Sequence, residues 1–383
     1  MPTNLPPEAL KKWEEYSEAQ SPEEKLRKLQ EFYSLMPKHK GTEKLEKFVK
    51  RRMSELRDEI ERQKAAKSRK GGGFAVEKRG AAQIVLIGFT NSGRSTVLSK
   101  LTNATPVISP YPFTTVDKPE EGMMEFRGAQ IQVVEAPPVV PEGGRLTNLA
   151  MSLSYNSDML GIVLDGRMNP VDQLNEIVAI LEKYNISLKR PKGVVRIVRS
   201  RAAPGIIVRN RGRIIDGSEH DVRRILEDYG IRQAWVEIEG EVSLSDVEES
   251  VFSEKRYKPF ILFVTHADDE IAMKNMEKLR NIGLVVPISP SLDVDKEAIG
   301  EYILKELNLI RVYTKPRAEK GFSEKALVVR KGTTAREIAR IIHEDLYENF
   351  KYAKVWSKRL PYSPMRVGPD FELEDGDAIE IIG

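Results

Sequence analysis

The loop between Gly88 and Thr96 constrains the fold more than any other part of the chain. Four apolar residues, 84–87, precede it, and a helix-like run that ends at Leu101 follows it. A strand, a glycine-bounded loop and a helix in this order are the setting of a phosphate-binding loop. The glycines let consecutive N–H groups face one anion, and the helix N-terminus adds positive potential. The expected phosphate-binding residues are Gly88, Asn91, Ser92, Gly93, Arg94, Ser95 and Thr96.

Short apolar runs recur along the middle of the chain, at 84–87, 131–134, 162–164 and 260–264. Runs of this length are typical of buried parallel strands. Helical stretches lie between them, and parallel strands need crossover helices. The sequence therefore predicts an α/β fold with a doubly wound sheet. Ligands of such sheets bind outside the carboxyl ends of the strands, which is where the glycine-bounded loop lies.

Three further segments flank or interrupt this sheet. Apolar residues at helical spacing before residue 61 predict an N-terminal helical arm, which a joint at Gly71–Gly73 separates from the sheet. The chain between residues 165 and 260 is longer than one crossover needs, which indicates an inserted small α/β module. Strand-like and helix-like runs near the end predict a β-grasp module. The predicted parts are the helical arm (1–80), the P-loop domain (81–169 and 256–312), the inserted module (170–255) and the β-grasp domain (313–383).

Composition excludes several classes of function. The chain of 383 residues has no cysteine, which excludes disulfides, thiolate metal sites and cysteine nucleophiles. Its four histidines are dispersed and indicate no metal cage. No apolar run approaches the roughly 20 residues that span a bilayer, and the N-terminus lacks the apolar core of a signal peptide. We therefore expect no membrane partner and a cytoplasmic location.

Net charge is only +3, but basic residues are concentrated in two segments. Residues 38–79 hold 15 Lys/Arg against 7 Asp/Glu, and residues 189–213 hold nine basic residues and no acidic one. Such clusters favour a polyanion partner, most simply RNA, over a solvated face that acids elsewhere balance. Alternating spacing is expected to project the arginines at 209, 211 and 213, and those at 199 and 201, from one strand face. The candidate RNA contacts are Arg196, Arg199, Arg201, Arg209, Arg211 and Arg213.

Short segments downstream of the loop stand where the other contacts of a nucleotide are expected. Thr114 and Thr115 follow the first helix and are candidates to complete a magnesium shell, to which Ser95 adds a hydroxyl. Glu135 ends a predicted strand and can hold magnesium through water. Asp268 follows a later strand and can accept hydrogen bonds from guanine. The residues assigned to the switch and base positions are Thr114, Thr115, Glu135, Pro137, Pro138, Thr265, His266, Asp268 and Ser289.

With these motifs in order, the chain resembles the Obg superfamily of GTPases over nearly its whole length. Within it, the chain is most similar to the Drg (developmentally regulated GTP-binding) subfamily and its archaeal relatives. Segments 111–115, 127–132, 350–356 and 362–368 carry the resemblance, and the tail looks like a TGS domain. The resemblance implies GTP or GDP with magnesium, and association with the ribosome or ribosomal RNA in translation. Asn91 matches a position that ligates potassium in related potassium-stimulated GTPases, so K⁺ is a second candidate ion.

Several positions depart from the family's pattern. Arg94 replaces the loop lysine, and its planar guanidinium is bulkier than an ammonium. Glu135–Pro138 replaces Asp-x-Pro-Gly, and Pro138 has no N–H with which to sense a γ-phosphate. Thr265–Asp268 keeps only the aspartate of Asn-Lys-x-Asp, and Ser289–Pro290 replaces Ser-Ala. These changes predict slow or absent hydrolysis and a weak or frozen switch, because a ligand that binds two states equally shifts neither.

Two other interpretations stay open. The chain is a non-catalytic ribosome- or RNA-binding protein on a degenerate GTPase frame, or it is an adaptor whose TGS domain or helical arm binds another protein. Trp356 and Tyr362 could stack on RNA bases. Such residues more often belong to the core or rim of a small domain, which is the interpretation adopted for them.

Overall fold

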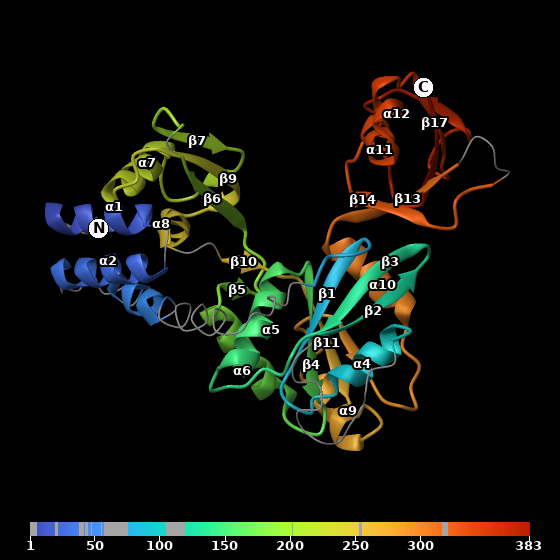
Figure 1. Cartoon of the computed structure of the whole chain (residues 1–383). Coiled ribbons are helices and arrows are strands. Elements are labelled where there is room, and N and C mark those ends of the chain that lie inside the picture. The colour runs from blue at the N-terminus through green and yellow to red at the C-terminus, as the bar shows by residue number, and fades with distance from the viewer. Residues whose placement is uncertain are drawn as a thin grey trace. The chain divides into compact units, whose positions relative to one another are not determined.

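The computed structural model describes residues 6–19, 22–37, 42, 45–46, 48–54, 56, 76–104, 119–200, 202–252, 255–315 and 321–383. The chain divides into two compact units (Figure 1). The first unit comprises residues 1–73 and 189–256, and the second comprises residues 74–188 and 257–383.

A six-stranded sheet forms the centre of the second unit. Its strand order is β12-β11-β4-β1-β3-β2, and all neighbours are parallel except β2, which pairs antiparallel with β3. β1 and β4 are buried over their whole length because helices cover both faces of the sheet. The strands are β1 (Ala82–Ile87), β2 (Glu120–Phe126), β3 (Ala129–Glu135), β4 (Met159–Asp165), β11 (Phe260–Thr265) and β12 (Val285–Pro287).

Helices pack on the two faces of this sheet. α4 and α10 contribute Leu98 and Ile303 to the core on one face. α5 and α6 contribute Met151 and Ile177 to the core on the other face. This arrangement confirms the predicted doubly wound fold, with one antiparallel edge strand. The helices are α4 (Arg94–Leu101), α5 (Arg145–Asn156), α6 (Pro170–Lys183), α9 (Glu270–Glu277) and α10 (Lys296–Glu306).

The C-terminal part of the second unit is the predicted β-grasp domain. Its five strands lie in the order β14-β13-β17-β15-β16 and share a core with α11. α11 begins with a capping box, in which the Glu337 N–H donates to Thr334 Oγ1 (3.4 Å) and the Thr334 N–H donates to Glu337 Oε2 (2.7 Å). The elements are β13 (Leu309–Thr314), β14 (Ala326–Arg330), α11 (Ala335–Ile342), α12 (Glu344–Glu348), β15 (Tyr352–Trp356), β16 (Met365–Val367) and β17 (Asp377–Ile382).

The turn between β2 and β3 joins the two sheets of this unit. The Ala326 N–H donates to Gly128 O at 3.0 Å, and the Tyr313 hydroxyl donates to Arg127 O at 2.8 Å. Gly128 has a φ of 79°, and a Cβ there would lie 2.3 Å from Glu324 O. Only glycine meets both conditions without strain. The start of β3 is therefore anchored on the β-grasp domain.

The first unit contains the helical arm and the insert. In the arm, Trp13, Phe32 and Val49 share a buried cluster, and the described residues between 45 and 56 are helical. In the insert, β6, β9 and β7 form a sheet, β8 pairs with β9, and α7 and α8 cover one face. The elements are α1 (Pro7–Glu18), α2 (Pro22–Leu35), β6 (Gly193–Arg199), β7 (Ile206–Asn210), β8 (Arg213–Ile214), α7 (Glu219–Asp228), β9 (Ala234–Val242) and α8 (Leu244–Phe252). Two short strands, β5 (Ile186–Ser187) and β10 (Arg256–Tyr257), pair with each other.

Two predicted domain boundaries differ from the elements that the structure shows. The sequence places α6 in the insert, but its apolar side packs into the core of the six-stranded sheet, so the insert begins at residue 189 rather than 170. The β-grasp domain begins at Leu309 rather than residue 313, because β13 pairs with β14 and β17 along its length. Within this domain, α11 and α12 are separated by His343, whose φ of −165° is extended.

Candidate functional site

The loop after β1 has the backbone of an anion cradle. Asn91 and Gly93 both have left-handed backbone, with φ of 62° and 91°, and α4 begins directly afterwards at Arg94. A Cβ on Gly93 would lie 2.7 Å from Thr265 Cγ2, so only glycine lets the loop approach β11 this closely. The successive turns direct N–H groups and the start of α4 toward one side of the loop.

Arg94 lies inside this loop. Its Nη1 donates to Gly88 O at 3.1 Å, and its Nε is 3.9 Å from Glu135 Oε1. Ser95 Oγ donates to the same Glu135 oxygen at 2.9 Å. The side chains of Arg94 and Glu135 are only 10% and 6% exposed, so the ion pair is largely shielded from water. The residues expected to hold phosphate and magnesium thus contact one another through Glu135.

Burial and pairing act on the two ionisable groups in opposite directions. Burial lowers the pKa of the Arg94 guanidinium, and the Glu135 charge opposes this effect. Burial raises the pKa of the Glu135 carboxyl, against the lowering effects of Arg94 and of the Ser95 hydrogen bond. An arginine stays protonated in proteins, so the cation at the loop persists.

Three buried polar atoms at this point have no hydrogen-bond partner among the described residues. They are Ser92 Oγ, Arg94 Nε and Glu135 Oε2. Unsatisfied buried polar atoms are rare in native proteins and each calls for an explanation. Two of the three are donors, which a phosphate oxygen would satisfy. The third is a carboxylate oxygen, which is a ligand that magnesium accepts.

The segment after Glu135 is hydrogen-bonded to β1 and the loop. The Ala136 N–H donates to Leu86 O and the Val139 N–H donates to Gly88 O, both at 3.0 Å. The two intervening prolines, Pro137 and Pro138, are buried and have no N–H. Residues 135–139 therefore continue the β1–β3 pairing alongside the phosphate loop.

The predicted base contacts lie at the ends of β11 and β12. Thr265 Oγ1 donates to Ser92 O at 2.9 Å and also lies 3.2 Å from Leu164 O, which ties the base strand to the phosphate loop. The Asp268 side chain is exposed and has no partner among the described residues. Ser289 is buried, and its hydroxyl lies 2.8 Å from Ser291 Oγ within its own loop.

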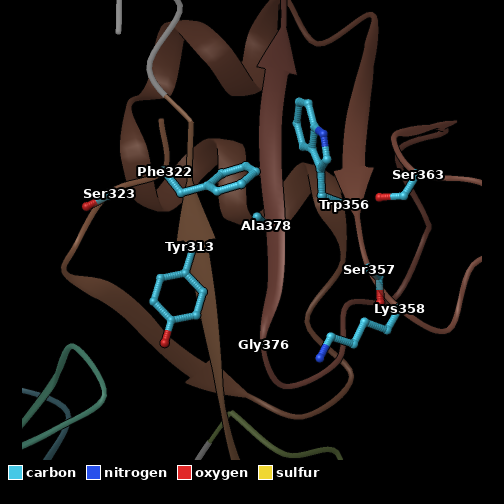
Figure 2. Close-up of a pocket in the computed structure, with 9 residues that line it drawn as sticks. All are labelled: Tyr313, Phe322, Ser323, Trp356, Ser357, Lys358, Ser363, Gly376 and Ala378. Atoms are coloured by element: carbon cyan, nitrogen blue, oxygen red, sulfur yellow. The ribbon is translucent and has the colours of Figure 1, made fainter. Parts of the chain in front are cut away.

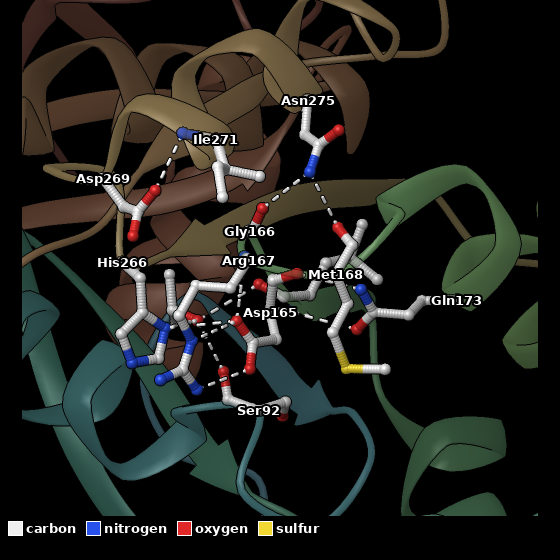
Figure 3. A network of polar contacts seen from close by, with 12 residues as sticks. Ser92, Asp165, Gly166, Arg167, Met168, Gln173, His266, Asp269, Ile271 and Asn275 are labelled. Carbon is white, nitrogen blue, oxygen red and sulfur yellow. Dashed lines mark hydrogen bonds and ion pairs between the residues drawn. The ribbon is translucent and has the colours of Figure 1, made fainter.

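Sequence reasoning missed one part of this site. Asp165, the last residue of β4, accepts hydrogen bonds from the Arg167 side chain at 3.1 and 2.8 Å and lies 3.3 Å from His266 Nδ1 (Figure 3). His266 has a left-handed φ of 55°. Burial would raise the pKa of Asp165, but the Arg167 hydrogen bonds outweigh it and the pKa is lowered. An acidic residue at the carboxyl end of a buried strand is the signal that could have identified it.

Thr114 and Thr115 lie outside the described residues. Within the part of the chain that the structure describes, no cluster of three or more histidine, aspartate or glutamate side chains could hold a metal ion. A search of the described helices finds none with the length and apolarity to cross a membrane.

The basic residues of the insert do not share one strand face. Arg196 on β6 and Arg209 on β7 pair in register with Glu237 of β9, on the face opposite the core. The Arg209 guanidinium lies 5.1 Å from the Trp235 ring centroid. β7 then ends at Asn210, which places the next two arginines elsewhere.

The prediction of a single basic face is therefore wrong in part. Arg211 stands in a turn, and Arg213 is on β8. Arg199 is an odd number of residues from Arg196 on β6, so the two point to opposite faces, and its Nη2 donates to Val251 O at 3.5 Å. Arg201 lies outside the described residues.

Comparison with known proteins covers most of the chain. Three family descriptions match in succession: "50S ribosome-binding GTPase" at residues 83–198, "C-terminal region of MMR_HSR1 domain" at 203–309 and "TGS domain" at 310–383. The solved YchF GTPase of Schizosaccharomyces pombe is 17% identical with a TM-score of 0.45, over 80% of this chain and 99% of that one.

Full-length relatives agree with these matches. GTP-binding protein 1 of Schizosaccharomyces pombe is 31% identical, over 93% of this chain and 99% of its own. An uncharacterized GTP-binding protein of Methanocaldococcus jannaschii is 30% identical, over 94% and 92%. Human developmentally-regulated GTP-binding protein 2 is 28% identical, over 94% and 98%. The chain belongs to the Obg-type GTPases, as a member of the Drg family with a C-terminal TGS domain.

Proposed function

We propose that the protein binds GTP or GDP in the loop from Gly88 to Thr96. It acts in translation, in the cytoplasm, through the ribosome or ribosomal RNA, and hydrolyses GTP slowly or not at all. The observation that carries the nucleotide proposal is a pair of buried donors at the start of α4, Ser92 Oγ and Arg94 Nε, which have no partner among the described residues. An unsatisfied buried donor costs free energy that an accepting phosphate oxygen would recover.

The remaining loop and base residues have defined roles in this proposal. Backbone N–H groups from residues 91–96 surround the phosphates with Ser92 and Arg94. Thr265 holds the base strand against the loop. The Asp268 carboxylate, which has no partner among the residues that the structure describes, accepts hydrogen bonds from guanine. Asn91, exposed at the rim of the loop, is the proposed K⁺ ligand.

Magnesium is proposed to have a reduced part in binding. Two oxygen atoms fit magnesium as ligands: Ser95 Oγ and Glu135 Oε2, the latter without a partner among the described residues. Thr115 is the third ligand expected from the sequence. When bound, the ion offsets phosphate charge. Arg94, however, already compensates the Glu135 carboxylate from 3.9 Å. Nucleotide affinity should therefore change little when magnesium is removed.

Slow hydrolysis and weak discrimination between GTP and GDP follow from residues 135–139. Pro138 cannot donate to a γ-phosphate, and the N–H groups of Ala136 and Val139 are used by Leu86 O and Gly88 O. Movement of this segment would break both backbone bonds, each worth about 0.5–1.5 kcal/mol. The segment has no free N–H to donate to the γ-phosphate in return, so the two nucleotides should bind alike.

Titration of a fluorescent guanine nucleotide tests the nucleotide proposal. We expect saturable binding that GTP and GDP compete with nearly equally and that ATP does not. Asp268→Asn should weaken it by about tenfold or more, because two charge-assisted hydrogen bonds of about 1.5–3 kcal/mol each are at stake. Asp293→Asn, an exposed aspartate outside the site, is the control. No binding of the wild type at high micromolar concentration would contradict the proposal.

The ribosome or RNA association is supported by two arginines on the outer face of the insert, Arg196 and Arg209, which flank Glu237, and by the family description that mentions ribosome binding. Arg196→Gln with Arg209→Gln should weaken co-sedimentation with ribosomes and make it less dependent on salt, because fewer counterions are released. Arg280→Gln, which removes an exposed arginine in the turn after α9, is the control. Unchanged co-sedimentation of the double variant would exclude this face.

The contact between Arg94 and Glu135 favours a second candidate, a non-catalytic RNA- or ribosome-binding protein on a GTPase frame. In that case Asp268→Asn leaves ribosome co-sedimentation unchanged, whereas a nucleotide-dependent association becomes weaker. If the TGS domain or helical arm binds a protein partner instead, the complexes survive nuclease treatment.

A further inference from the structure

The outer face of the TGS sheet contains a hollow of about 590 Å³ (Figure 2). The register explains it: Ala378 on β17 pairs with Tyr313 on one side and with Trp356 on the other. A small side chain between two aromatic ones leaves a depression. The core residues Val312, Val355 and Ile379 point to the opposite face, toward α11. The hollow is thus a feature of the face that α11 leaves open.

Aromatic rings form the walls of this hollow. Phe322 and Trp356 meet edge to face, with ring centroids 5.4 Å apart and an interplanar angle of 70°. Phe322 is 48% exposed, so about half of its surface is open to solvent. Figure 2 shows the Tyr313, Phe322 and Trp356 rings around Ala378. The rings therefore line the hollow with apolar walls that stand at an angle to one another.

The charge around the hollow is positive. Lys315 Nζ lies 4.7 Å from the Trp356 ring centroid, and Lys358 is on the rim without an ion pair to any described residue. None of the nine lining residues is acidic; they are Tyr313, Phe322, Ser323, Trp356, Ser357, Lys358, Ser363, Gly376 and Ala378.

The same face continues as a basic strip. Lys354 pairs in register with Arg366 on one side and Glu380 on the other. The Arg366 guanidinium lies 3.8 Å from the Tyr352 ring centroid, and Glu380 forms an ion pair with Lys354 at 3.4 Å. One carboxylate among these basic side chains leaves the strip cationic.

We propose that this hollow binds an unstacked base of single-stranded RNA, whose neighbouring phosphates contact Lys358 and the Lys354–Arg366 strip. Aromatic walls that stack a base, next to cations that follow a backbone, are the two elements of single-strand recognition. The serine hydroxyls on the rim can donate to or accept from base edges. The inference rests on the RNA association proposed above and assigns it a site. It replaces the interpretation of Trp356 as a rim residue alone.

Fluorescence anisotropy with a labelled oligouridylate of about 12 nucleotides, a length that several single-strand sites would cover, tests this proposal on the full chain. Trp356→Ala should weaken binding by about fivefold or more, since stacking of one base contributes at least that factor. Trp356→Phe should restore most of it. Tyr362→Ala, an exposed aromatic of the same domain that does not line the hollow, should bind as the wild type does.

Three results would overturn the proposal. The first is that Trp356→Ala binds the oligonucleotide as tightly as the wild type does, and the second is that Trp356→Ala weakens binding of a duplex that contains the same sequence by the same factor. The third is that uridine monophosphate displaces the labelled oligonucleotide as effectively as unlabelled oligonucleotide does. If the wild type binds no RNA at all, the RNA association itself fails. If it binds RNA independently of Trp356, only the site fails. Guanine-nucleotide affinity of Trp356→Ala, measured in parallel, should equal that of the wild type and shows that its P-loop domain is folded, while recovery in Trp356→Phe shows that the loss comes from the ring.

Discussion

Removal of one charge from the Arg94–Glu135 pair should destabilise the phosphate loop more than removal of both. The two side chains are 10% and 6% exposed, and their closest charged atoms are 3.9 Å apart. At an effective dielectric constant of about 20, unit charges at this separation attract by about 4 kcal/mol. Loss of one partner of a buried pair typically costs about 3–5 kcal/mol, because the other charge stays buried alone.

Arg94→Gln, Glu135→Gln and the double variant form the test. Each single variant should lower the opening free energy of β1 and α4 by about 3 kcal/mol, while the double variant should stay within about 1 kcal/mol of the wild type. Hydrogen exchange followed by mass spectrometry on peptides from β1 and α4 measures this locally, which suits a chain of several domains. Arg280→Gln is the control for a lost exposed arginine.

The pH dependence of the stability lost in Arg94→Gln provides a second test of the buried ion pair. Burial raises the pKa of Glu135, and Arg94 opposes this. A carboxyl with a raised folded pKa stabilises the folded state less as pH rises through that value. The deficit of Arg94→Gln should therefore grow with rising pH. Additive single variants, or a deficit that is constant with pH, would refute the description of a coupled buried pair.

Further predictions concern backbone and surface. Gly93→Ala should weaken guanine-nucleotide binding by about tenfold or more, since its φ of 91° and the 2.7 Å approach to Thr265 exclude a Cβ; wild-type affinity in a nucleotide titration would contradict this. Gly128→Ala should speed hydrogen exchange at β14, and unchanged exchange there would show that the turn does not anchor the TGS domain. Hydrogen bonds from Lys28 and Lys12 lower the pKa of Glu15 to about 2. The contribution of Glu15 to the stability of the α1–α2 contact is thus present above its unfolded pKa near 4.5 and is lost as pH falls toward 2. Helix content, followed by circular dichroism, should decrease over this pH range.

Most of the fold could be predicted from the sequence, because short continuous apolar runs are typical of strands in a buried parallel sheet. These runs are at 84–87, 131–134, 162–164 and 260–264. The error at α6 has a physical cause. An amphipathic helix such as α6 buries its apolar side wherever a complementary face exists, and the sequence does not say which of two cores supplies that face. Only the contacts of Ile177 and its neighbours decide it.

The sequence predicted which residues lie around the loop, but not the contacts that they make. Motif spacing placed Ser92, Arg94 and Glu135 near one another, yet the contact of Arg94 with both Gly88 O and Glu135 depends on a rotamer that no spacing encodes. The prediction that the alternating arginines share one strand face was wrong in part for a similar reason. A two-residue periodicity holds only while a strand continues, and β7 ends at Asn210.

A crystal structure with GDP is the most direct test of the central claim, that residues 88–96 hold a nucleotide diphosphate with Arg94 as a phosphate ligand. We predict that Arg94 Nε, together with Ser92 Oγ, lies within hydrogen-bond distance of phosphate oxygens, about 2.7–3.2 Å. Crystals grown with excess GDP in which Arg94 still contacts only Gly88 O and Glu135, with no nucleotide at the loop, would contradict the claim.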